Sequence, residues 1–340
     1  MELIRVIMGK SLFYYVYILL CIGLFLGLYF GFRKKDKKTQ NMVLMIFLWG
    51  NFALHFIKLG FPNYVAKGFP EVLRKSSFEN ICAVSTLIFP FIYMSKRTKA
   101  LKDYMFYLGA ISGIAGCVAP FPVSTEVWNG AAGLPFYHPD TIRYYLCHAG
   151  IWIVPILMVL FGLHKLDYRR IWKVICIYFA VLGVIIVNEL ILIRIGWVDM
   201  PLTMEDFLRN ASGRDLGYAL GPTSALEGAL QAVLWLTPKA WKDPYVPILW
   251  EFFPVVILGG LIMFAVSMIW EKEHFKADCV VLKANVLDKV AKFKAWKAEK
   301  FPSKNSALQN PNQKSTAETV ENEPVTPIGD TTDTEEKNND

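Results

Sequence analysis

Four side chains that can carry or exchange a proton lie within apolar segments of this chain: His55, Cys82, His148 and Glu189. A thiol beside a neutral imidazole can give up its proton, and the thiolate can then attack an ester carbonyl and hold the acyl group as a thioester. The imidazole serves first as base and then as acid toward the leaving alcohol. Because ionisable groups are costly inside a bilayer, four at one depth indicate a functional site. A cysteine in a membrane span is more often a packing residue, so both interpretations of Cys82 stay open.

The segments that hold these residues are predicted membrane spans. The 340 residues are 54% hydrophobic and only 19% charged, with a mean hydropathy of +0.35. Such a composition is rare in a soluble domain. Runs of about 20 apolar residues, long enough to cross a bilayer as helices, recur through most of the chain. We therefore predict an all-α, polytopic membrane helix bundle with seven spans, at 11–32, 41–61, 78–95, 101–120, 141–163, 171–193 and 248–270.

Basic residues collect in alternate loops and predict the orientation of the bundle. They follow the first span at 33–38, the third at 96–99 and the fifth at Lys165, Arg169 and Arg170. Short loops rich in lysine and arginine stay in the cytoplasm, so the N-terminus is predicted outside and the C-terminus inside. The formal net charge of +7 belongs mainly to these loops and to the segment after the last span. This positive charge favours anionic lipid headgroups at the cytoplasmic face as partners, and not nucleic acid. The predicted location is the cell membrane, as a multi-pass protein.

The chain changes character after the predicted seven-helix domain, 1–270. Residues 271–301 mix lysines with apolar residues at helical spacing, which predicts a basic amphipathic juxtamembrane helix, either lying on the inner leaflet or solvated. Residues 302–340 are polar and acidic and are predicted to be disordered. The six cysteines include no C-x-x-C pair, and neither a metal site nor a cofactor is predicted.

Helical spacing enlarges the set of polar residues around the first four. At a rise of about 1.5 Å per residue, the four lie roughly 6–10 Å below the predicted outer end of their spans. Residues three or four apart share a helix face, and helices of a bundle turn polar faces inward. The predicted polar cavity therefore contains Cys82 and His148 together with the supporting residues His55, Glu79, Ser85, Tyr144, Asn188 and Glu189. The glycines Gly109, Gly113 and Gly116 of the fourth span predict a face where another helix approaches closely.

Several segments in succession carry a family resemblance. They are Ala-Leu-His at 53–55, Asn-Ile-Cys-Ala-Val-Ser at 80–85, the glycine-rich stretch 107–120, Tyr-Tyr-Leu-Cys-His at 144–148, Asn188 and Leu-Gly-Pro at 220–222. Over roughly 41–225 this order resembles the YwaF-like integral membrane proteins of bacteria. That family is distantly similar to transmembrane protein 164, an acyltransferase of ether phospholipids whose activity is attributed to a cysteine and a histidine. The resemblance implies a membrane phospholipid substrate, with Cys82 as nucleophile and His148 as the catalytic histidine.

Glu79 departs from the family pattern, because it puts a carboxylate one turn from the thiol of Cys82. A nearby negative charge disfavours a thiolate unless the carboxylate is paired, and His55 or Arg143 are the expected partners.

Two hypotheses about the function are consistent with these residues. The first is a phospholipid acyltransferase or transacylase that uses Cys82 and His148, with His55 and Glu189 as orienting groups. The second is a non-enzymatic seven-span transporter or receptor that binds an ion, a proton or a small ligand at the same polar cavity. The separation between Cys82 and His148 distinguishes the two, because a proton transfer requires hydrogen-bond reach.

Overall fold

The computed structural model describes residues 4–66, 68–125, 127–128, 131–197, 218–221, 233–242 and 245–300. This part is helical, apart from the antiparallel pair β1 (Val127–Trp128) and β2 (Ala131–Ala132). The chain divides into two compact units, Met1–Lys276 and Ala277–Asp340, which are described separately. The predicted tail at 302–340 and most of the predicted outer connection at 195–246 lie outside the described residues.

Within the described residues, six helical segments are long and apolar enough to cross a membrane, and they correspond to six of the seven predicted spans. Their main helices are α1 (Leu12–Phe32), α2 (Lys37–Ile57), α6 (Lys99–Val118), α8 (Pro139–Leu160), α9 (Ile171–Arg194) and α13 (Gly260–Trp270). The remaining prediction, at 78–95, is not confirmed as a span, because the helix there, α5 (Ile81–Met94), has 14 residues. At 1.5 Å per residue it is about 21 Å long, shorter than a hydrocarbon core of roughly 30 Å.

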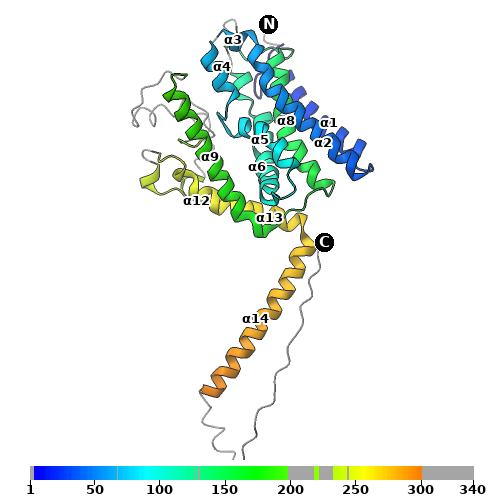
Figure 1. The fold of residues 1–340 in the computed structure, drawn as a ribbon, viewed down its shortest axis with the longest axis vertical. Helices are drawn as coiled ribbons and strands as arrows, with labels where there is room; N and C mark the ends of the chain where they lie inside the picture. Colours follow the sequence, from blue (N-terminus) through cyan, green and yellow to red (C-terminus); the bar gives the residue numbers. More distant parts are fainter. Residues whose placement is uncertain are drawn as a thin grey trace, which may run out of the picture. The chain divides into compact units, whose positions relative to one another are not determined.

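The helix α5 begins late because the chain before it forms separate short helices, α3 (Pro62–Val65) and α4 (Phe69–Ser76). Both lie at one end of the bundle, the predicted outer end (Figure 1). Asn80 then caps α5, since its side chain accepts a hydrogen bond from the backbone N–H of Ala83 at 2.9 Å. The spacing predicted that Glu79 shares a helical face with Cys82 and Ser85. In the structure Glu79 precedes the helix and is not part of that face.

The closest helix pair of the bundle is α6 with α8, and the predicted small-residue face makes it possible. A Cβ atom at Gly109 would lie 2.7 Å from the carbonyl oxygen of Ile151, and one at Gly113 would lie 2.8 Å from that of His148. Real Cβ atoms do not approach so closely, so these positions admit only glycine unless α8 moves. The prediction of close approach along the glycines of α6 is thus confirmed. The helices α2 and α5 also pack against this pair.

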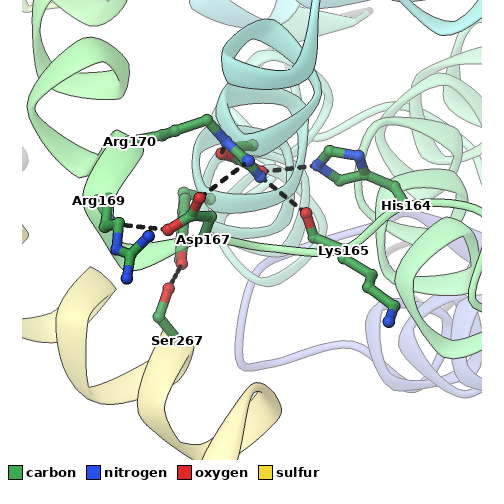
Figure 2. A network of polar contacts seen from close by, with 8 residues as sticks. His164, Lys165, Asp167, Arg169, Arg170 and Ser267 are labelled. Atoms are coloured by element: carbon green, nitrogen blue, oxygen red, sulfur yellow. Dashed lines mark hydrogen bonds and ion pairs between the residues drawn. The ribbon is translucent and has the colours of Figure 1, made fainter. Parts of the chain in front are cut away.

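A buried ionic network ties the opposite end of α6 to the chain after α8 (Figure 2). Asp103 is fully buried and bonds Nε2 of His164 at 2.6 Å and the guanidinium of Arg170, whose Nη2 lies 3.1 Å away. Arg170 also bonds the carboxylate of Asp167 at 3.2 Å and the carbonyl of Lys165 at 2.7 Å. Asp103 therefore stabilises the start of the fourth predicted span. Because two carboxylates compensate Arg170, the loop carries less free positive charge than the sequence count assumes, and the orientation of the bundle remains a prediction.

The last span and the helix after it complete the described fold. The span combines a 3₁₀ turn, Leu249–Glu251, the short α12 (Phe252–Pro254), a π-helical segment, Val255–Gly259, and α13. A hydrogen bond between the hydroxyls of Tyr107 and Ser267 joins α13 to α6. Where the sequence predicts a basic juxtamembrane helix, α14 (Lys272–Lys300) is a continuous helix with no buried side chain among its described residues.

Candidate functional site

His148 is held on α8 in one orientation by Tyr144, one turn before it. Its Nδ1 lies 2.8 Å from the backbone carbonyl oxygen of Tyr144. A carbonyl oxygen only accepts, so Nδ1 must carry the proton, and in the neutral ring Nε2 keeps its lone pair. The two rings lie 4.1 Å apart, and the hydroxyl of Tyr144 donates to the carbonyl of Gly116 at 3.0 Å. Tyr144 therefore fixes both the tautomer of His148 and its place beside α6.

The free edge of the His148 ring contacts α6 at Gly116. A Cβ atom at this position would lie 2.7 Å from Nε2 and 2.1 Å from Cδ2. No side chain other than that of glycine fits there without displacing the imidazole. Gly116 thus provides the space that His148 occupies between α6 and α8.

Cys82 lies in the first turn of α5 and contacts the same part of α6. Its Sγ is 4.0 Å from the carbonyl oxygen of Ser112. Ser112 and Gly116 are four residues apart on one helix, a rise of about 6 Å. The structure therefore places Cys82 and His148 against one turn of α6. Within the described residues His148 bonds Tyr144 and not Cys82, and both side chains keep partial exposure while most of their neighbours are buried.

Two buried hydroxyls lie near the thiol without a hydrogen-bond partner among the described residues. Ser85 is 0% exposed and follows Cys82 by three residues on α5, which puts it on the same helical face. The second hydroxyl belongs to Ser112, whose carbonyl contacts Sγ. Buried polar atoms are normally paired, so two unpaired donors beside a thiol are a notable feature of this site.

Two other predicted residues contact the chain segment that precedes Cys82. Nε2 of His55 lies 3.2 Å from the carbonyl oxygen of Ser76, and Nδ2 of Asn188 donates to Oγ of Ser77 at 2.9 Å. These contacts hold the end of α4 between α2 and α9. His55 and Asn188 therefore anchor the segment that leads into Cys82, and their supporting role in a shared cavity stays a prediction.

The two predicted carboxylates form ion pairs with the same segment. Glu189 is fully buried and lies 3.3 Å from Nε of Arg74, and Glu79 bonds Nζ of Lys75 at 3.0 Å. The expectation that Glu79 pairs with His55 or Arg143 is wrong, because Lys75 on the preceding turn is its partner. With its charge compensated, Glu79 opposes a thiolate at Cys82 less than the sequence suggested.

A second polar cluster at the predicted outer end was not foreseen. Asp140, in the first turn of α8, bonds Nε of Arg143 at 2.6 Å and the hydroxyl of Tyr64 at 3.0 Å. Burial, followed by the neighbouring Asp140 carboxylate, raises the pKa of Tyr64 above its usual range. Lys58, only 4% exposed, is the other member. Its spacing of three residues from His55 was the signal that could have found it.

Comparison with known proteins gives one match. The model of the TMEM164 family matches residues 7–197, more than half of the chain and all of the predicted site residues. No curated protein and no solved structure matches the chain. Of the two resemblances expected from the sequence, this match supports the one to transmembrane protein 164. With its six apolar helices, the chain is a multi-pass membrane protein and belongs to the TMEM164 family.

Proposed function

We propose that this protein is a membrane phospholipid acyltransferase, with Cys82 as the nucleophile and His148 as the general base and acid. The proposal rests on the contacts of Cys82 and His148 with one turn of α6, together with the bond from Nδ1 of His148 to Tyr144, which leaves Nε2 unprotonated. A catalytic imidazole requires this arrangement, in which one nitrogen is oriented by the protein and the other is available to the reactant.

The proposed reaction has two acyl transfers. Nε2 of His148 takes the thiol proton, the thiolate of Cys82 attacks the acyl carbonyl of a phospholipid, and a C–S bond forms as the ester C–O bond breaks. The departing oxygen takes the proton from His148 and leaves as a lysolipid alcohol. An acceptor hydroxyl then gives its proton to His148 and attacks the thioester, which breaks the C–S bond and restores the thiol. Cys82 and His148 must close to hydrogen-bond distance when the lipid binds, as catalytic groups commonly do.

The hydroxyls of Ser85 and Ser112 supply a candidate oxyanion site. Each acyl transfer passes through a tetrahedral intermediate whose oxygen carries a negative charge, and donors aimed at that oxygen lower the barrier. Both hydroxyls are buried beside Cys82 and have no hydrogen-bond partner among the described residues. We propose that one or both donate to the oxyanion.

The contacts of the other polar residues of the predicted cavity favour this function over the binding of an ion or a transported ligand. That alternative needs His55, Asn188 and Glu189 to face a common cavity with His148. In the structure they bond the segment Arg74 to Ser77 instead. Groups that are already engaged in anchoring a loop are poor candidates for a site that must bind and release a ligand.

We propose the outer leaflet of the cell membrane as the location of the reaction. The basic loops predict that the ends of α2 and α9 and the beginnings of α5 and α8 face outward. Cys82 and His148 then lie a short way below the lipid headgroups, where the acyl ester bonds of phospholipids are found. Phospholipids are accordingly the proposed partners of this site.

The test is to trap the acyl-enzyme in purified, reconstituted protein supplied with a phospholipid that carries an isotope-labelled acyl chain. We expect intact mass spectrometry to show one labelled acyl group, removable by hydroxylamine and located on Cys82. Cys82→Ala should form no adduct and transfer no acyl chain. The matched control is Cys176→Ser, which changes an exposed cysteine of α9 and should behave as wild type. Full acyl transfer by Cys82→Ala would contradict the proposal.

A further inference from the structure

Lys58 is a buried lysine that has no partner in the described part of the chain. It follows α2 and is only 4% exposed. Its ammonium forms no hydrogen bond and no ion pair with any described residue, and its interactions are longer-range electrostatic ones. Lysine is almost never buried to this degree unless an opposite charge is paired with it. A ligand with a negative charge would therefore be stabilised at this position.

The carboxylates around Lys58 are already used by other cations. Those close enough to act on it electrostatically are Glu79 and Asp140. Glu79 bonds Lys75 at 3.0 Å, and Asp140 bonds Arg143 at 2.6 Å. Among the described side chains of this cluster, three cations therefore face two carboxylates. The positive charge left over is the one on Lys58.

This excess charge acts on His148, one of the two proposed reactive residues. The charges of Lys58 and Arg143 both act on the rings of His55 and His148. Lys58 follows His55 by three residues toward the predicted outer end of the bundle, a rise of about 4.5 Å. In a phospholipid the phosphate likewise lies a few ångströms outward of the acyl ester. Lys58 thus lies on the predicted headgroup side of His55, the side on which a phospholipid carries its phosphate.

We propose that Lys58, assisted by the field of Arg143, binds a phosphate group, and that this phosphate belongs to the headgroup of a phospholipid. The identification of the anion as a lipid phosphate rests on the proposed acyl transfer, whereas the need for an anion at Lys58 rests on its burial and lack of a partner alone. Lysine is a common point-charge ligand of phosphate, and a charge-assisted hydrogen bond in a site of low dielectric is strong.

The test measures lipid binding to full-length protein in detergent, in the Cys82→Ala background so that no acyl transfer takes place. Three probes are titrated by calorimetry: a short-chain phosphatidylcholine, the diacylglycerol with the same chains, and inorganic phosphate. We expect the phosphatidylcholine to bind more tightly than the diacylglycerol. Lys58→Gln should weaken phosphatidylcholine binding by about tenfold or more, as for the loss of a charge-assisted hydrogen bond. Diacylglycerol binding should not change.

Two further variants separate recognition from folding. Lys58→Arg keeps the charge and should retain phosphatidylcholine binding, and Lys38→Gln removes an exposed lysine at the other end of α2 and should have no effect. Lys58→Gln should not lower the Tm of the lipid-free protein, because it removes an uncompensated buried charge.

Three results would overturn the proposal. They are unchanged phosphatidylcholine binding by Lys58→Gln, equal affinity for the diacylglycerol, or no phosphatidylcholine binding by the parent protein. Lys58-dependent binding of inorganic phosphate without that of the lipid would show that the anion is free phosphate and that the lipid assignment is wrong. Lys58-dependent lipid binding, together with a protein that forms no thioester when Cys82 is present, would contradict the acyl transfer and leave the phosphate site standing.

Discussion

Replacing Gly116 with alanine should disable His148 while leaving the fold intact. The added Cβ would lie 2.1 Å from Cδ2 of the imidazole. Carbon atoms in contact are about 3.5 Å apart, so the ring must move by roughly 1.4 Å. A misplacement of about 1 Å in a catalytic group can lower the rate about 100-fold. We therefore expect the rate of thioester formation at Cys82 to fall by about that factor.

The stability of this variant should change little. Overpacking costs about 1–3 kcal/mol, and replacing a mid-helix glycine with alanine returns up to about 1 kcal/mol. The assay compares the rate of thioester formation with the Tm of the same preparation. The matched control is Gly183→Ala on α9, where a Cβ atom meets nothing within 4 Å, so its rate should be that of wild type. A Gly116→Ala protein with the wild-type rate would refute the assignment of His148.

Three further predictions concern the groups that hold the bundle. Asp103→Asn should lower the free energy of unfolding by about 3 kcal/mol, because it leaves the partly buried Arg170 without its main partner. Thermal unfolding in detergent measures this loss, and an unchanged Tm would contradict the prediction. Glu189→Gln should weaken the bond to Arg74, loosen α4 and speed the alkylation of Cys82 by iodoacetamide, whereas a slower or equal rate would show that α4 does not set the exposure of the thiol. Tyr64→Phe should cost about 1 kcal/mol at neutral pH through the lost hydrogen bond. Because the pKa of Tyr64 is raised in the folded state, the wild type loses stability as pH rises through the unfolded value of 10.0, and the gap between the two proteins should narrow there.

The placement of Cys82 and His148 near one part of α6 was largely predictable from the sequence. The glycines of α6 indicated a close helix approach, and the helical spacing of Tyr144 and His148 put both on one face. Spacing could not show the hydrogen bond from Nδ1 of His148 to the carbonyl oxygen of Tyr144, which fixes the tautomer of the imidazole. Hydrogen-bond geometry depends on side-chain rotamers, and periodicity carries no information about them.

The role of His55 and Glu189 could not be predicted, because their partners lie in a segment without a hydrophobic signal. The prediction placed both residues in one cavity on the basis of depth alone. Their partners, Ser76 and Arg74, belong to α4, a helix of eight residues that folds back onto the bundle. Lys58 was missed for a different reason. A lysine three residues from the end of a span resembles an ordinary interfacial lysine, and only the structure shows that it is buried.

The shortness of α5 has a consequence for how the protein is assembled. At 14 residues α5 is shorter than a hydrocarbon core, and most of its side chains are buried against other helices. Its entry into the membrane must therefore follow the association of α2, α6 and α8, which provide the space that it fills. Cys82 stands in its first turn, so the thiol and His148 come to lie against the same turn of α6 only in a completed bundle. Under the proposed function, chains that stall during insertion would carry Cys82 without His148 nearby, and acyl transfer would be confined to correctly assembled protein.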